Sequence, residues 1–166
     1  MPDPLAPVPL LFGDFAAEHK TTRRFLERYP AGKDDWRPHE KSRALGALAT
    51  HVADIVNRGV AVLTTEFLAI GAKPPMTPLG TAEELIAHFE AGLAKLDAAL
   101  AAATLAHLEQ PWQMRHGERV VAEAPRRLML RRIMMSHTIH HRAQLGVYYR
   151  LLGIPVPGSY GPSADE

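Results

Sequence analysis

The sequence has no cysteine at any of its 166 positions, and this absence removes several kinds of chemistry together. It excludes disulfide bonds, thiolate metal ligands and a cysteine nucleophile. Any metal bound by this chain must therefore be held by histidine or carboxylate side chains. The lack of cysteine also fits a cytoplasmic protein, which is the location that we expect.

A strong charge of either sign and long apolar runs are also missing. The formal net charge is +1, whereas nucleic-acid and membrane-surface proteins usually carry a clustered basic excess, so we expect neither kind of partner. No apolar run reaches the roughly 18 residues of a transmembrane helix. The opening stretch from Met1 to Pro9 lacks a basic segment followed by an apolar one, so we expect no secretory signal. With 46% hydrophobic residues, the composition is that of a soluble globular protein, and the length predicts a single domain over residues 1–166.

Apolar residues that recur every three or four positions predict four helices, over residues 11–29, 42–70, 81–103 and 125–152. Ser42 is the expected N-cap of the second helix, and Thr81 with Glu84 is a predicted capping box at the start of the third. Gly153 is expected to end the fourth. Residues 107–124 are the least helical stretch and predict either a small hairpin or an irregular crossover. The predicted fold class is all-α, a four-helix bundle with long crossover connections.

Two histidines one helical turn apart are the strongest functional signal. His137 and His141 lie on the apolar stripe of the fourth predicted helix, and side chains at positions i and i+4 are neighbours, about 5–6 Å apart at Cβ. Both rings can therefore point a nitrogen at one common ion. His51, at the edge of the buried face of the second helix, is the candidate for a third ligand, and three protein ligands leave one coordination position open. The alternative is that the pair only lines or caps one end of the bundle.

Three further residues near the pair are candidates for contacts with the ligands or with a substrate. His140 lies on the flank of the stripe, Gln144 follows it by one turn, and Tyr148 lies on the stripe itself. Gln144 and Tyr148 are expected either to hydrogen-bond a substrate or water at the ion, or simply to face a polar pocket. The sequence has no H-E-x-x-H motif, so a thermolysin-like protease is not indicated.

A series of short motifs spans nearly the whole chain, in the order Trp36–Ser42, Leu45–His51, Trp112, His137–Leu145, Gly153–Pro157 and Tyr160–Ser163. Together they resemble the DinB/YfiT-like family of bacterial four-helix-bundle metalloproteins. By this resemblance, the chain binds a divalent metal ion through His51, His137 and His141. The ion implied is nickel or zinc in the first place, with manganese or iron as alternatives.

The resemblance also implies a function, in two versions. The first is a metal-dependent enzyme for a small-molecule substrate, either similar to thiol S-transferases or a hydrolase, with the ion as Lewis acid. Because the chain has no cysteine, the thiol must come from a low-molecular-weight cosubstrate. The second version is a non-enzymatic, stress-related helical bundle that binds a metal or ligand. The family resemblance further implies a homodimer, and no acid or base residue is assigned.

Overall fold

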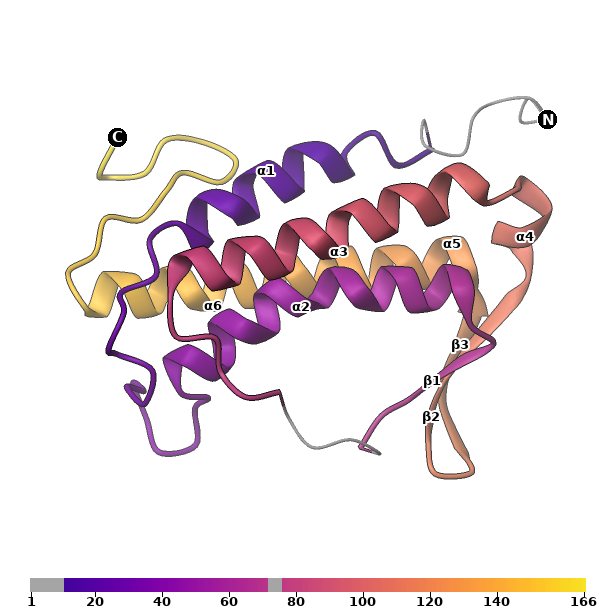
Figure 1. Ribbon diagram of the computed structural model, residues 1–166, viewed down its shortest axis with the longest axis horizontal. Helices are drawn as coiled ribbons and strands as arrows, with labels where there is room; N and C mark the ends of the chain where they lie inside the picture. The colour runs from indigo at the N-terminus through magenta and orange to yellow at the C-terminus, as the bar shows by residue number, and fades with distance from the viewer. Residues whose placement is uncertain (1–10, 72–75) are drawn as a thin grey trace.

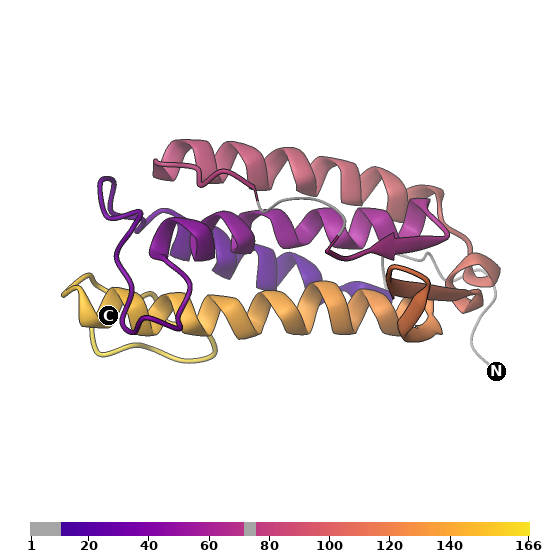
Figure 2. The same ribbon diagram turned by 90° about the horizontal axis from the view of Figure 1, so that it is seen from below.

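Four long helical segments run side by side along the long axis of the protein in the computed structural model, which describes residues 11–71 and 76–166 (Figure 1). They are α1 (Phe15–Leu26), α2 (Leu45–Thr64), α3 (Ala82–Ala102) and a final rod made of α5 (Arg126–Met129), η2 (Leu130–Ser136) and α6 (His137–Leu151). Viewed from below, α2 lies between α3 and the rod, with α1 behind them (Figure 2). The opening stretch considered above for a secretory signal lies outside the described residues.

A small sheet at one end of the bundle shows that the predicted all-α class is wrong. After the short helix α4 (Leu105–Glu109), strands β2 (Pro111–His116) and β3 (Arg119–Pro125) form an antiparallel hairpin, which is the first of the two alternatives that the sequence left open. Strand β1 (Phe67–Ala69) pairs in parallel with β2, which gives a three-stranded mixed sheet. The sequence predicts residues 67–69 as the end of the second helix. They form a strand instead because their backbone pairs with residues far along the chain, a contact that local periodicity does not report.

The start of α2 is fixed by the backbone of the preceding loop. The predicted N-cap Ser42 is wrong, because the helix begins at Leu45. The amide of Leu45 donates to the carbonyl of Trp36 at 2.8 Å, and the amide of Gly46 donates to that of Asp34 at 2.9 Å. These carbonyls satisfy amides that have no partner within the helix, which is the task of an N-cap side chain. The loop is thereby tied to the helix that carries His51.

A side chain and a glycine set the start of α3 and the end of the rod near the predicted positions. The Thr81 hydroxyl accepts a hydrogen bond from the amide of Glu84 at 3.2 Å and begins α3, which is half of the predicted capping box. The carboxylate of Glu84 accepts from the amide of Gly80, at 3.0 Å, instead of that of Thr81. Gly153, with φ +71°, follows the rod in the left-handed region that favours glycine. The amide of Ile154 then returns to the carbonyl of Tyr149 at 2.9 Å. α1 is shorter at both ends than the predicted range of 11–29.

The core lies between the helices, and a buried arginine joins α2 to the rod. The guanidinium of Arg126 donates to the carbonyl of Val62 and, at 2.7 Å, to that of Thr65, so it satisfies acceptors at the end of α2. Large buried side chains come from every long segment, among them Phe25, Leu48, Val52, Leu85, Phe89, Leu130, Met134 and Leu145.

Among the described residues, no helix combines the length and the apolar character that crossing a membrane requires.

Candidate metal centre

Three histidine rings from two helices meet between α2 and the rod. His51 comes from the second turn of α2, His137 is the first residue of α6, and His141 follows one turn later. Nε2 of His137 lies 3.2 Å from Nε2 of His51 and 2.8 Å from Nε2 of His141. One ring nitrogen from each of the three lies within 4.8 Å of the other two.

These separations fit a shared cation. Zinc–nitrogen bonds of about 2.0–2.1 Å at tetrahedral angles place two ligand nitrogens about 3.3 Å apart. The two measured Nε2–Nε2 distances of 3.2 and 2.8 Å lie close to that value. Imidazole nitrogen is also a ligand that suits zinc, nickel and iron. The three residues therefore fit a divalent metal ion by geometry and by donor type.

The approach of α2 to the rod is close on both sides of the three rings. On one side, a Cβ at Gly59 would overlap the sulfur of Met134, so the absence of a side chain permits this approach. On the other side, the hydroxyl of Tyr148 donates to the backbone carbonyl of Arg43 at 3.0 Å. The two helices run antiparallel between these contacts, and His51 therefore lies opposite the pair on α6.

The turn of the rod immediately before His137 is π-helical. η2 spans Leu130–Ser136, and α6 begins at the next residue. A π turn holds about one residue more than an α turn, so it rotates the side chains that follow by about 100° relative to an uninterrupted α-helix. Such turns occur frequently at functional sites. This segment sets the direction in which His137 and His141 point, and the apolar periodicity of the sequence does not predict it.

A hydrogen bond selects the nitrogen that His141 presents to the other rings. Nδ1 of His141 lies 2.7 Å from Oε1 of Gln144. Because an amide oxygen can only accept, Nδ1 must carry the hydrogen, which leaves the Nε2 of the neutral ring with a free lone pair. Partners of this kind orient metal ligands and increase their basicity. Gln144 therefore holds His141 in the tautomer that a cation at the three Nε2 atoms needs.

The surroundings keep the three rings neutral at neutral pH. Burial, followed by the neighbouring ring of His141 and then by Arg43 and Arg58, lowers the pKa of His51 to about 3. Burial, followed by Arg58, lowers the pKa of His137 to about 4. Burial also lowers the pKa of His141. Neutral imidazole is the form that binds a metal, so a cation meets little competition from protons at this site.

The two other residues that the sequence suggested near the site, His140 and Tyr148, differ in burial and in what they contact. His140 is exposed, and its ring centroid is 4.7 Å from that of His141. Tyr148 is buried, with its ring packed edge-on against Trp36 at 5.5 Å. Its hydroxyl donates to the backbone carbonyl of Arg43, and this hydrogen bond connects α6 to the loop before α2. No motif in the sequence marks Arg58, although its position two turns after His51 places both residues on one side of α2.

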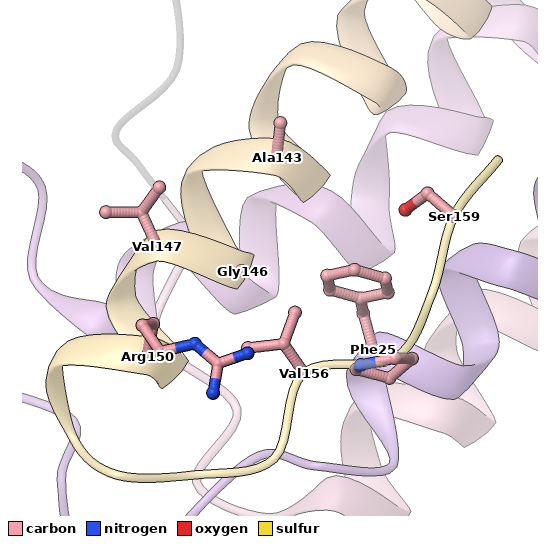
Figure 3. Close-up of a pocket in the computed structure, with 8 residues that line it drawn as sticks. Phe25, Ala143, Gly146, Val147, Arg150, Val156 and Ser159 are labelled. Carbon is pink, nitrogen blue, oxygen red and sulfur yellow. The ribbon is translucent and has the colours of Figure 1, made fainter. Parts of the chain in front are cut away.

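A shallow depression of about 290 Å³ lies on a different face of α6, between that helix and the C-terminal tail (Figure 3). Phe25, Gly146 and Val156 contribute to its wall. Gly146 lies five residues after His141, which corresponds to about 140° around the helix. Arg150, at its rim, forms an ion pair with Asp165. This depression is therefore separate from the three histidines.

These observations define a class of protein, a helical bundle with a three-histidine group between its second and last long helices. The chain belongs to the DinB family, whose sequence profile matches residues 1–166. A DinB-like protein from Bacillus cereus ATCC 10987 is similar in structure, with a TM-score of 0.68 and 19% identity over 90% of this chain and 95% of that one. A DinB-like protein from Bacillus subtilis has a TM-score of 0.66 and 20% identity over 88% of this chain and 96% of that one. At such identities the similarity establishes the fold alone. Comparison with curated proteins gave no match.

Proposed function

We propose that this protein is a metal-dependent enzyme that holds one divalent ion through His51, His137 and His141. The observation that carries the proposal is the convergence of three neutral ring nitrogens, within 4.8 Å of one another. Lone pairs that point at one another repel, and a cation between them removes the repulsion. Nickel or zinc is the proposed ion, with manganese and iron as alternatives, since imidazole sites accept several first-row metals.

An open coordination position favours catalysis. Over the described residues, the group of potential ligands contains three histidines and no carboxylate. Three protein ligands are typical of catalytic sites, whereas structural zinc sites usually have four. When bound, the ion would supply a Lewis acid that lowers the pKa of a water or thiol. The proposed reaction is thiol transfer or hydrolysis of a small molecule, and any thiol is a cosubstrate because the chain has no cysteine.

The residues of the chain have separable tasks in this proposal. The three histidines bind the ion, and Gln144 orients His141 through its 2.7 Å hydrogen bond. All three histidines are partly buried, so the packing around them limits access of water to the site. The proposal includes a homodimer, which the family resemblance implies, and a cytoplasmic location, which the absence of cysteine fits.

One observation favours a second candidate function, a closed site with a structural or sensory role. The exposed ring of His140 lies 4.7 Å from that of His141, so rotation of its side chain would offer a fourth imidazole. Four protein ligands would leave no position for a substrate. The protein would then bind metal without turnover.

Elemental analysis of the purified protein tests the premise that both candidates share. We expect about one divalent ion per chain, lost in His51→Ala and in His141→Ala. His116→Ala is the matched control, because this exposed histidine lies on β2, and it should retain the ion. Absence of metal from the wild-type protein, or retention of metal by His51→Ala, would refute both functions.

A second measurement separates the two candidates. The visible spectrum of the cobalt(II)-substituted protein should change when a small thiol is added, because a ligand enters the open position. Turnover should then appear in a panel of thiols and electrophiles. A spectrum that is insensitive to thiols in the wild-type protein, but becomes sensitive in His140→Ala, would identify the closed site.

A further inference from the structure

The candidate metal centre carries an excess of positive charge that the protein does not neutralise. Its three ligands are neutral imidazoles, so a bound divalent ion would keep its full charge. Besides the histidines themselves, the charged side chains that depress the pKa of His51 are Arg43 and Arg58. The same two arginines act on His141, and Arg58 acts on His137. Over the described residues, the main causes of these three pKa shifts include no carboxylate.

Arg58 borders the site at one end. It lies two helical turns after His51, so both side chains project from the same side of α2. It is partly buried, and burial lowers its pKa. The nearest acid along the helix is Asp54, but its Oδ1 is 2.9 Å from His88 on α3 and also accepts from Asn57 at 2.9 Å.

Arg58 itself forms no ion pair with an acid among residues 11–71 and 76–166. The charge of Asp54 acts on Arg58 without forming an ion pair, and burial still lowers the pKa of this guanidinium, so a bound anion would offset part of its desolvation cost. Arg58 is therefore available to a ligand of the site.

Arg43 borders the site at the other end. It precedes the first residue of α2, and its carbonyl accepts the hydroxyl hydrogen of Tyr148 at 3.0 Å. Tyr148 lies two turns after His141 on α6, so this contact places the backbone of Arg43 beyond His141 along the same helix face. Its side chain is exposed. The two arginines thus come from opposite ends of the three rings along the line where α2 meets the rod, and their side chains are close enough that the charge of Arg43 lowers the pKa of Arg58.

We propose that the substrate or cosubstrate of this site is a small anion, whose donor atom takes the open coordination position while its negative group is bound by Arg43 and Arg58. The chemical class is a thiol, or another donor, that carries a carboxylate, sulfonate or phosphate group. A guanidinium presents parallel N–H donors that match such groups. This inference rests on the proposed metal site and adds the charge of the molecule that the site selects.

The experiment compares two thiols with the same three-carbon chain, 3-mercaptopropane-1-sulfonate, which ends in a charged sulfonate, and 3-mercaptopropan-1-ol, which ends in a neutral hydroxyl. Sulfonate is a weak metal ligand. A difference in affinity between the two thiols therefore measures binding of the sulfonate by the arginines and not its coordination to the metal ion. Each thiol is titrated into the cobalt(II)-loaded protein and followed by visible absorption. We expect the sulfonate to bind about thirtyfold more tightly, the effect of a hydrogen bond to a charged group. In Arg58→Gln this preference should fall by about tenfold, and in Arg43→Gln, whose side chain is exposed, by about threefold.

Controls assign the effect to these two positions. Arg28→Gln removes an equal charge from an exposed residue after α1, and it should leave the preference unchanged. Arg58→Lys keeps the charge without the paired donors and should retain part of the preference, which covers the case that Arg58→Gln does not fold. The cobalt content of every variant is measured first. A wild-type protein without cobalt would refute the metal site and this inference together.

Other outcomes refute the charge selection alone. Wild-type protein that holds one cobalt per chain but binds both thiols equally would overturn it. So would a preference that persists in the Arg43→Gln/Arg58→Gln variant, since the ion alone would then set it. An equal loss in Arg28→Gln would show a general effect of net charge and would overturn it too.

Discussion

Replacement of Gln144 by leucine is expected to weaken metal binding without unfolding the protein. The change removes the acceptor that lies 2.7 Å from Nδ1 of His141. The net value of such a hydrogen bond is about 0.5–1.5 kcal/mol. Loss of a partner that orients a ligand typically lowers metal affinity by about 10- to 100-fold. Because Gln144 is exposed, we expect the lower end, about tenfold, which equals about 1.4 kcal/mol.

The assay is competition for zinc between the protein and a chromogenic chelator at pH 7.5. Gln144→Glu keeps an acceptor in place and should bind zinc at least as tightly as the wild-type protein. Gln110→Leu, at another exposed glutamine, should have no effect. Denaturant unfolding of the metal-free Gln144→Leu variant should stay within about 0.5 kcal/mol of the wild type. Zinc affinity of Gln144→Leu within twofold of the wild-type value would refute the role assigned to this hydrogen bond.

Three further predictions concern the stability of the metal-free protein. His51 and His137 have folded pKa values of about 3 and 4, below the ordinary 6.5, so the folded state binds fewer protons. Its stability should be complete above pH 6.5 and should fall as the pH decreases toward 4, as measured by urea unfolding. Gly92→Ala should destabilise the protein by about 1–3 kcal/mol, because the new Cβ would overlap a methyl group of Val56. Arg126→Met should lower the free energy of unfolding by about 2–3 kcal/mol, since it removes the donors that satisfy carbonyls at the end of α2.

Matched variants make these predictions specific. The slope of stability between pH 6.5 and 5 should be smaller in His51→Ala, and an unchanged slope would contradict the assignment to the buried rings. Ala91→Gly, at an exposed site on the same helix as Gly92, should cost about 1 kcal/mol through helix propensity. Stabilisation of Gly92→Ala by a similar amount would show that α2 and α3 are not in tight contact there. Arg127→Met should have a much smaller effect than Arg126→Met, because the ion pair of Arg127 with Glu109 is exposed.

The features that the sequence predicts correctly depend on neighbours in the chain. Helix periodicity places His137 and His141 on one side of a single helix, because that relation requires only 3.6 residues per turn. The side-chain cap at Thr81 and the glycine that follows the rod involve contacts within a few residues. The hairpin between β2 and β3 is closed by a two-residue turn in which Gly117 has φ +56°, a local requirement of primed hairpin turns.

The features that needed the tertiary structure depend on segments that are distant in sequence. Strand β1 exists because it pairs with β2, and α2 begins at Leu45 because the carbonyl of Trp36 accepts its amide. The register of α2 against the rod brings Nε2 of His51 within 3.2 Å of Nε2 of His137. The same register places Arg43 and Arg58 on either side of the rings, since two antiparallel helices align residues at equal distances from their crossing. The sequence alone therefore determined which side chains are available for a metal, whereas packing between helices decided that they meet and which charges surround them.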